Sequence, residues 1–399
     1  MECVILAAGE GKRMRPLTAG RPKVMLPLAN RPMMEYLMDA AIKAGVSGFI
    51  LVVGYGEQVV RSYFSDGSKK GVRIRYVTQR RQKGTGDAVL TCRHLIDGPF
   101  LIMNGDMLME SRDIEALIRA GPDCMGVTSS DHPEDYGVVE VQGNRVTNLV
   151  EKSPHPPGNL INAGIYLFSP DIFTILERLP CSPRGEYEIT DALEVLIKEK
   201  KLSAYQLSSW LDVGYPWDLL EANEILLRGI KTENSGEIED GVMIRGPVII
   251  GSGTVVRSGT CIDGPCVIGD KCVVGPHAYI RGSTSIGDNC HIGHCTEIKN
   301  SVIMADTKIP HFNYVGDSVV GSGCNFGAGT KIANLRHDHG EIRIQGKPTR
   351  RVKLGAIIGD EVKFGINCSV NVGTVIGSRV LVSPGSLVDG FIEEGSKIR

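Results

Sequence analysis

A bulky apolar residue recurs at every sixth position through the second half of this chain. The first run is Ile244, Ile250, Val256, Ile262, Ile268, Val274, Ile280, Ile286, Ile292, Ile298 and Met304. The step continues through Tyr314, Val320, Phe326 and Ile332, and again from Ile358 to Val388. An α-helix repeats about every 3.6 residues and a single strand about every two, so neither explains this period. Short strands that coil with one inward apolar residue per side do explain it, and the pattern predicts a parallel β-helix of hexapeptide repeats.

Two interruptions of the period mark places where the coil should change. The first is a phase slip between Met304 and Tyr314, and His311 falls inside it. The second separates Ile332 from Ile358 by 26 residues, which is not a multiple of six. We expect regular packing to be broken at both.

The first 230 residues have a different pattern, in which short apolar strands alternate with helical stretches. The expected strands are Cys3–Ala7, Gly48–Val53, Arg73–Thr78 and Phe100–Asn104, and the expected helices are Met33–Ala44, Glu57–Phe64, Ala88–Leu95 and Ser111–Ala120. This alternation predicts a doubly wound α/β sheet. A last helix over Leu219–Arg228 and a polar linker over Gly229–Gly236 place one domain at 1–230 and the second at 237–399.

Composition narrows the function classes. The chain has 44 basic and 46 acidic residues and a net charge of −2, so neither nucleic acid nor an anionic membrane is an expected partner. Its 11 cysteines include no C-x-x-C pair, which favours reduced thiols in the cytoplasm over disulfides or a zinc ribbon. The start MECVILAAGEGKRMRP is neither a signal peptide nor a membrane anchor.

The first expected strand runs into a glycine-rich basic loop, LAAGEGKRMRPLTAGRPKVMLPL. Glycines let backbone N–H groups approach an anion and the cations neutralise it, so this loop predicts phosphate binding. It has neither the Walker spacing nor a G-x-G-x-x-G dinucleotide motif. Farther along, Asp106 follows the strand Phe100–Asn104 closely, and the carboxyl end of a strand is where an open α/β sheet binds its ligand.

The string LAAGxGxRMxPLTxxxPKxMLPL resembles the sugar-1-phosphate nucleotidylyltransferases. The resemblance implies that Arg13 grips a triphosphate and that Lys23 grips the α-phosphate or the sugar phosphate. It implies a nucleotide site made by Ala8, Gly9, Gly11, Gln79, Gly84 and Thr85, in which the Gln79 amide matches the edge of uracil or thymine. Asp106 and Asp212 resemble the two Mg²⁺ ligands, and Gly137, Glu151 and Asn162 the sugar-contacting residues.

The second half carries its own resemblance. The string KNSVIMADTKIPHFNYVGDSVVGSGCNFGAGTKIAN resembles the acetyltransferase domain of bifunctional glucosamine-1-phosphate acetyltransferase/uridylyltransferases, which implies a left-handed β-helix. His311 matches the catalytic histidine in H-x-x-Y-x-G-D, and Ala328 the residue whose N–H binds the oxyanion. The residues that match the acetyl-acceptor site are Arg281, Lys299, Tyr314, Asn325 and Asn334.

These resemblances imply a bifunctional enzyme that acetylates glucosamine-1-phosphate with acetyl-CoA and then couples the product to UTP, as a homotrimer. One alternative is a single-activity glucose-1-phosphate thymidylyl- or uridylyltransferase with a structural β-helix. A non-catalytic regulatory subunit would be expected to lack Lys23 or Asp106, and both are present.

The choice between UTP and dTTP stays open because Asp212 is typical of thymidylyltransferases. The sugar also stays open. The basic segment 333–353 resembles the archaeal-type proteins and suits CoA phosphates, a neighbouring subunit or a solvated loop.

Overall fold

The structure is a computed structural model that describes residues 1–182 and 185–399. The chain forms two compact units. The first comprises Met1–Glu10, Arg21–Met25 and Met33–Asp212, and the second comprises Gly11–Gly20, Leu26–Pro32 and Val213–Arg399. No helix of the described residues is both long enough and apolar enough to cross a membrane.

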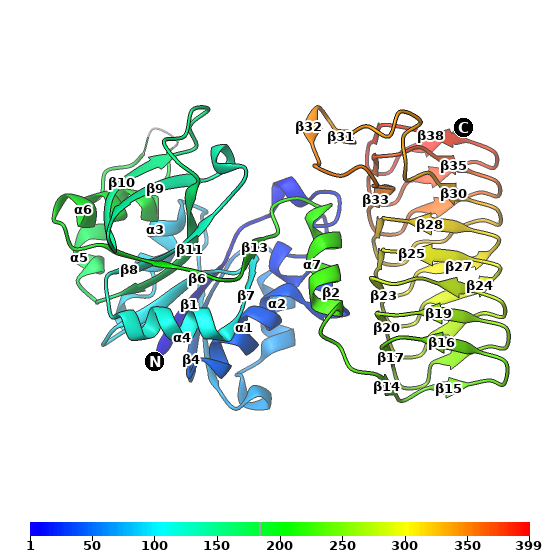
Figure 1. Cartoon of the computed structure of the whole chain (residues 1–399), viewed down its shortest axis with the longest axis horizontal. Helices are drawn as coiled ribbons and strands as arrows, with labels where there is room; N and C mark the ends of the chain where they lie inside the picture. Colours follow the sequence, from blue (N-terminus) through cyan, green and yellow to red (C-terminus); the bar gives the residue numbers. More distant parts are fainter. Residues whose placement is uncertain (183–184) are drawn as a thin grey trace. The chain divides into compact units, whose positions relative to one another are not determined.

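A nine-stranded mixed sheet with the order β5-β4-β1-β6-β11-β8-β12-β10-β9 forms the first unit (Figure 1). Its parallel half comprises β1 (Glu2–Ala7), β4 (Gly48–Val53), β5 (Arg73–Thr78) and β6 (Phe100–Asn104). Three of these have the bounds expected from the sequence. The other half comprises β8 (Cys124–Ser129), β9 (Gly137–Gln142), β10 (Arg145–Glu151), β11 (Leu160–Phe168) and β12 (Ser203–Gln206).

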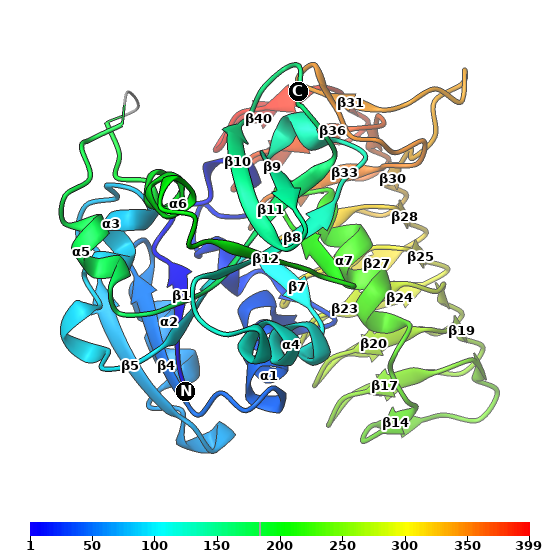
Figure 2. The same cartoon turned by 60° about the vertical axis from the view of Figure 1, so that its left-hand side comes forward.

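Helices cover both faces of this sheet, as Figure 2 shows. The first four are α1 (Met33–Lys43), α2 (Glu57–Phe64), α3 (Thr85–Leu90) and α4 (Ser111–Ala120), and the last two are α5 (Ile172–Leu176) and α6 (Ile189–Lys198). Successive residues of β1 point to opposite faces, so Ile5 joins a core with Leu37 of α1, while Val4 joins a second core with Leu193 of α6. The doubly wound arrangement follows from that alternation.

The helix expected over Ala88–Leu95 differs from the one observed. α3 begins at Thr85, because Gly84 adopts a φ of 105° that turns the chain directly into the helix. It ends at Leu90, and a separate 3-10 turn covers Arg93–Leu95.

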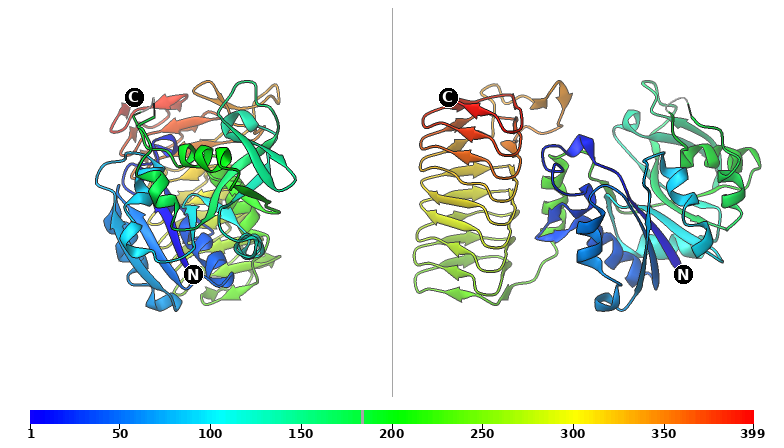
Figure 3. Two further views of the ribbon diagram at one scale, coloured as in Figure 1. Left: turned by 90° about the vertical axis from the view of Figure 1, so that its left-hand side faces the viewer. Right: turned by 180° about the vertical axis from the view of Figure 1, so that it is seen from behind.

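Three series of short parallel strands make up residues 233–399, which we call the repeat region (Figure 3). The first series is β14 (Glu233–Asn234), β17 (Val248–Ile250), β20 (Cys266–Ile268), β23 (Thr284–Ile286), β26 (Val302–Ile303), β29 (Val319–Val320), β33 (Ala356–Ile358), β36 (Thr374–Ile376) and β39 (Phe391–Ile392). The second is β16 (Met243–Arg245), β19 (Cys261–Asp263), β22 (Tyr279–Ile280), β25 (Glu297–Lys299), β28 (Tyr314–Gly316), β30 (Lys331–Ile332), β35 (Ser369–Val370) and β38 (Leu387–Val388). The third is β15 (Glu237–Ile238), β18 (Val255–Val256), β21 (Val273–Val274), β24 (His291–His294) and β27 (Lys308–His311), followed by β34 (Lys363–Phe364), β37 (Leu381–Val382) and β40 (Lys397–Ile398).

The chain visits the three series in turn, and each strand pairs with the equivalent strand of the next coil. Ile250 pairs with Ile268 and Ile268 with Ile286, which gives a coil of three hexapeptides. The inward apolar residues form one continuous core along the stack. This arrangement is consistent with the parallel β-helix that the six-residue period predicts.

The phase slip lies elsewhere than the sequence suggested. Ile286 pairs with Ile303, so the coil is shortened by one residue just after Ile298. From there the inward positions continue at Ile309 and Val315, which are both fully buried. The next inward residue, Val320, follows after five residues and not six. Tyr314 is therefore not an inward residue. It precedes the inward Val315 and faces outward, and His311 lies in a regular coil between the two shortenings.

The linker expected over Gly229–Gly236 contains β14, which already pairs with β17, so the repeat region starts earlier than predicted. Before it, α7 (Asp218–Leu227) and the hairpin of β2 (Pro27–Leu28) and β3 (Arg31–Pro32) belong to the same unit. Asn223 of α7 is fully buried; its side chain accepts the Ala29 N–H at 2.8 Å and donates to the Ser283 carbonyl at 3.0 Å. This amide links the hairpin, α7 and the repeat region.

The second break in the period is an insertion between two coils. The chain still forms β30 in the stack, and it leaves the stack between β30 and β33. It forms an antiparallel hairpin of β31 (Arg343–Ile344) and β32 (Lys347–Pro348), drawn in orange in Figure 1. Lys347 donates from Nζ to the Tyr215 hydroxyl at 3.2 Å, within the second unit.

Candidate active sites

A lysine and two carboxylates lie at the carboxyl end of β6 in the first unit. Asp106 follows this strand, and Lys23 lies in a short 3-10 turn, Lys23–Met25. The Lys23 ammonium contacts Asp106 Oδ2 at 2.6 Å, and the lysine side chain is only 9% exposed. Asp212 ends the strand β13 (Trp210–Asp212), which pairs antiparallel with β7 (Met107–Met109) so that Asp212 stands opposite Met107. Residues predicted from distant motifs are thus brought to one edge of the sheet.

The donor set of this edge fits Mg²⁺. Among the described residues no group of three or more His, Cys, Asp or Glu side chains could enclose a metal ion. Mg²⁺ does not require such a cage, because it is usually held by one or two carboxylates together with substrate phosphates and water. Two aspartates beside a buried lysine match an ion that arrives with a nucleotide.

Gln79 and the Gly84–Thr85 turn are also held together. Gln79 is 7% exposed and donates from Nε2 to the Gly84 carbonyl at 3.0 Å and to Asp87 Oδ2 at 2.8 Å. Both partners can only accept, so the amide nitrogen must face them and Oε1 is the end that can accept from a ligand. Gly84 allows no side chain, because a Cβ would lie 2.4 Å from the Tyr187 carbonyl oxygen. Asp87 was not predicted, and only its helical spacing from Gly84 could have suggested it.

The glycine loop after β1 divides between the two units. The Ala8 carbonyl accepts from Gln82 Nε2 at 2.8 Å, and Gly9 is exposed. Gly11 has a φ of 67° and begins the 3-10 turn that carries Arg13. In the second unit the Arg13 guanidinium lies 5.3 Å from the centre of the Tyr215 ring, which stacks on Trp217.

The residues predicted to contact a sugar lie on neighbouring strands. Gly137 of β9 pairs with Glu151 of β10, and a Cβ at Gly137 would come within 2.8 Å of Glu151 Oε1. Asn162 of β11 exchanges hydrogen bonds with the Tyr166 hydroxyl. Sequence reasoning missed Trp210, whose indole N–H donates to the Ala163 carbonyl at 2.8 Å.

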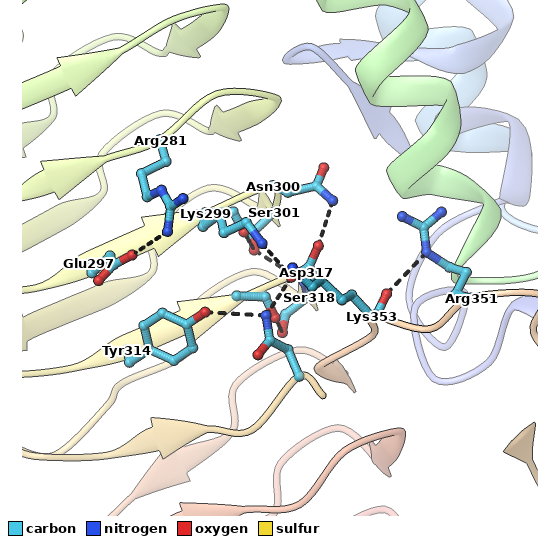
Figure 4. A network of polar contacts seen from close by, with 12 residues as sticks. Arg281, Glu297, Lys299, Asn300, Ser301, Tyr314, Asp317, Ser318, Arg351 and Lys353 are labelled. Carbon is cyan, nitrogen blue, oxygen red and sulfur yellow. Dashed lines mark hydrogen bonds and ion pairs between the residues drawn. The ribbon is translucent and has the colours of Figure 1, made fainter. Parts of the chain in front are cut away.

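A second polar cluster lies on the outer face of the repeat region (Figure 4). Tyr279, Glu297 and Tyr314 pair in register along β22, β25 and β28 and flank the inward residues. Arg281 Nη1 contacts Glu297 Oε1 at 3.0 Å, and Asn334 Nδ2 donates to the Tyr314 hydroxyl at 3.2 Å. Burial, together with the negative charges of Glu297 and Asp317, raises the pKa of Tyr314, so its hydroxyl remains a proton donor. Four of the predicted acetyl-acceptor residues, Arg281, Lys299, Tyr314 and Asn334, thus come from successive coils of one sheet.

His311 lies on the third strand series, whereas this cluster lies on the second. It is exposed at the end of β27, in register with His294, and in the described chain it shares no hydrogen bond with the cluster. The turn that carries Ala328 lies on the adjoining coil, where the Gly329 N–H donates to the His311 carbonyl at 3.0 Å. Within the described residues the Ala328 N–H has no protein acceptor. Asn325 bridges β27 and β34 through its backbone and is exposed.

Comparison with known proteins finds a match to each half of the chain. A family model described as nucleotidyl transferase matches residues 2–229, and a model described as the GMPPB C-terminal domain matches residues 262–381. Among solved structures, a putative glucose-1-phosphate thymidylyltransferase from Bacillus anthracis is 26% identical, with a TM-score of 0.54, and the match covers 59% of this chain and 98% of that one.

Curated relatives match the chain over its length. A protein from Sulfurisphaera tokodaii named bifunctional sugar-1-phosphate nucleotidylyltransferase/acetyltransferase is 38% identical, over 99% of each chain. The chain belongs to this family. Proteins named bifunctional protein GlmU from Methanococcus maripaludis strain C7 and Methanocaldococcus jannaschii are 48% and 42% identical over 99% of this chain, which corresponds to 96% and 97% of theirs. The resemblance predicted from the motifs of both halves is confirmed.

Proposed function

We propose that the chain makes UDP-N-acetylglucosamine in two steps, each on its own site. The observation that carries the proposal is the presence in one chain of two separate polar centres, Lys23 with Asp106 in the first unit and the Arg281–Asn334 cluster in the second. We further propose one domain over 1–230, a left-handed β-helix domain over 237–399 with β14 pairing ahead of it, and assembly as a homotrimer in the cytoplasm.

In the nucleotidyl step, a sugar-1-phosphate oxygen forms a bond to the α-phosphorus of the nucleotide, and the bond to pyrophosphate breaks. Lys23 neutralises charge on the α-phosphate, Arg13 binds the triphosphate, and the amides of Ala8, Gly9 and Gly11 orient it. Asp106 and Asp212 would hold Mg²⁺, which supplies positive charge to the phosphates when bound.

The base and the sugar are selected beside this centre. The fixed amide of Gln79 presents Oε1 to the base, where it can accept the ring N–H of uracil or thymine. Gly84 and Thr85 border the base, while Gly137, Glu151 and Asn162 bind the sugar. A comparison of UTP with dTTP decides between these two bases.

In the acetyl step, His311 removes a proton from the amine of glucosamine-1-phosphate, and the amine nitrogen forms a bond to the thioester carbon of acetyl-CoA. The carbon–sulfur bond then breaks and releases the thiol. The Ala328 N–H stabilises the oxyanion. Arg281, Lys299 and Tyr314 bind the sugar phosphate, and Asn325 and Asn334 orient the sugar and its amine.

The test is to incubate the chain with each nucleoside triphosphate and each sugar-1-phosphate, with and without acetyl-CoA, and to measure pyrophosphate and free thiol. Thiol release with glucosamine-1-phosphate, followed by pyrophosphate release with UTP, is expected. Pyrophosphate without thiol for any amino-sugar phosphate would favour the single-activity alternative, in which the repeat region only assembles the protein.

A further inference from the structure

Asp317 is the last residue of the H-x-x-Y-x-G-D string, and its side chain lies within the polar cluster on the repeat region. The resemblance implies no role for it. Its carboxylate is 4% exposed. Oδ2 contacts the Lys299 ammonium at 3.3 Å and accepts from Asn334 Nδ2 at 2.5 Å, and Oδ1 accepts from Asn300 Nδ2 at 2.7 Å (Figure 4). A buried carboxylate is tolerated only when it is paired and hydrogen-bonded, and these three partners provide that.

The backbone of Asp317 is fixed as firmly as its side chain. Its N–H donates to the Lys299 carbonyl at 2.9 Å, and its carbonyl accepts from the Gly355 N–H at 2.8 Å, where the insertion returns to the coil. The residue adopts a φ of 49°, a conformation that aspartate accepts more readily than most residues. The carboxylate therefore has a defined position relative to two successive coils.

This position dictates what the neighbouring groups can offer a ligand. An ammonium has three N–H donors, so Lys299 keeps donors for a phosphate after its contact with Asp317. The Asn334 amide nitrogen donates to Asp317 Oδ2 and to the Tyr314 hydroxyl. A carboxylate can only accept, so the nitrogen must face it, and Asn334 Oδ1 is the end left to accept from an amine or hydroxyl of the sugar.

We propose that Asp317 is a positioning residue for the acetyl acceptor: it holds Lys299 for the sugar phosphate and orients the Asn334 amide so that its oxygen faces the acceptor amine. The inference rests on the proposed acetyl transfer. It adds a residue that need not touch the substrate, and it predicts that the acceptor site, and not the acetyl-CoA site, depends on this buried charge.

The test is Asp317→Asn, which keeps the shape of the side chain and removes its charge. The KM for glucosamine-1-phosphate should rise by about 10- to 100-fold, the size expected when hydrogen bonds to a charged group are lost. The KM for acetyl-CoA and the nucleotidyl activity should change by less than about twofold. Asp288→Asn is the matched control, because that carboxylate is exposed and accepts the Asp270 N–H at 2.8 Å, and it should change neither constant.

A double-mutant cycle separates positioning from general damage. If Asp317 acts through Lys299, then Asp317→Asn should raise the acceptor KM much less in a Lys299→Ala background than in the wild type. An unchanged acceptor KM in Asp317→Asn would overturn the proposal, and an equal increase in both backgrounds would overturn the part of it that acts through Lys299. A wild-type chain that releases no thiol with any amino-sugar phosphate would instead refute the proposed acetyl transfer itself.

A milder variant keeps the test usable if Asp317→Asn does not fold. Asn300 has a φ of 43°, which glycine adopts without strain, so Asn300→Gly removes one hydrogen bond to Asp317 and leaves the turn intact. It should raise the acceptor KM by about two- to tenfold and leave the acetyl-CoA KM unchanged. Equal changes in both constants would refute the positioning role.

Discussion

Replacing Lys23 by methionine tests the effect of a single charge in the first unit. Methionine preserves most of the length and volume of the side chain and removes the ammonium that contacts Asp106 Oδ2 at 2.6 Å. The Lys23 side chain is 9% exposed, so water cannot take the place of its charge beside a phosphate. Losing one preorganised donor of this kind costs about 3–4 kcal/mol of transition-state stabilisation, or roughly a 100- to 1000-fold loss of kcat/KM.

The effect on folding should be much smaller. Asp106 is 30% exposed and stays partly hydrated when the Lys23 ammonium is removed, so we expect the free energy of unfolding to fall by about 1 kcal/mol. That corresponds to a decrease of about 2–4 °C in Tm for a unit of this size. A large loss of nucleotidyl activity with a small change in Tm therefore identifies a functional lysine.

The assay is pyrophosphate release from UTP with N-acetylglucosamine-1-phosphate and Mg²⁺, run beside thiol release from acetyl-CoA. Lys23→Met should lose the first and keep the second within about twofold. Lys69→Met is the control, since Lys69 is an exposed lysine of the same unit, and both activities should stay at wild-type levels. Near-wild-type pyrophosphate release by Lys23→Met would refute the assignment of the nucleotidyl site, and equal loss of both activities would refute separate sites.

His311→Ala should abolish thiol release and leave pyrophosphate release intact, whereas a parallel loss of both would indicate a structural histidine. Chelating Mg²⁺ should stop nucleotidyl transfer and spare acetyl transfer, and a loss of both would contradict the metal assignment. Ile309→Ala should lower the free energy of unfolding by about 2–5 kcal/mol in denaturant titrations, while Tyr314→Phe, which removes only an outward hydroxyl, should lower it by no more than about 1 kcal/mol. Light scattering should report a trimer, and a stable monomer at micromolar concentration would contradict the proposed homotrimer.

Patterns that are local in the sequence predicted strand bounds, the coil and the family. The strands Gly48–Val53 and Phe100–Asn104 have their expected bounds, because each is an apolar run buried between two layers of helices. Arg73–Thr78 also has its expected bounds, as a partly exposed strand at the edge of the sheet. The six-residue period predicts the coil because a single inward residue per side is a local requirement that repeats. The motif around Lys23 indicates the family because its residues are contiguous in the chain.

Contacts between distant segments could not be predicted from these local patterns. A one-residue shortening after Ile298 leaves the period almost intact, and only the pairing of Ile286 with Ile303 shows where it falls. A buried charge such as Asp317 leaves no periodic signal, since its partners Lys299 and Asn334 come from other coils. The period specifies which residues face the core, but neighbours across coils depend on how many residues each coil contains, and the tertiary structure alone fixes that number.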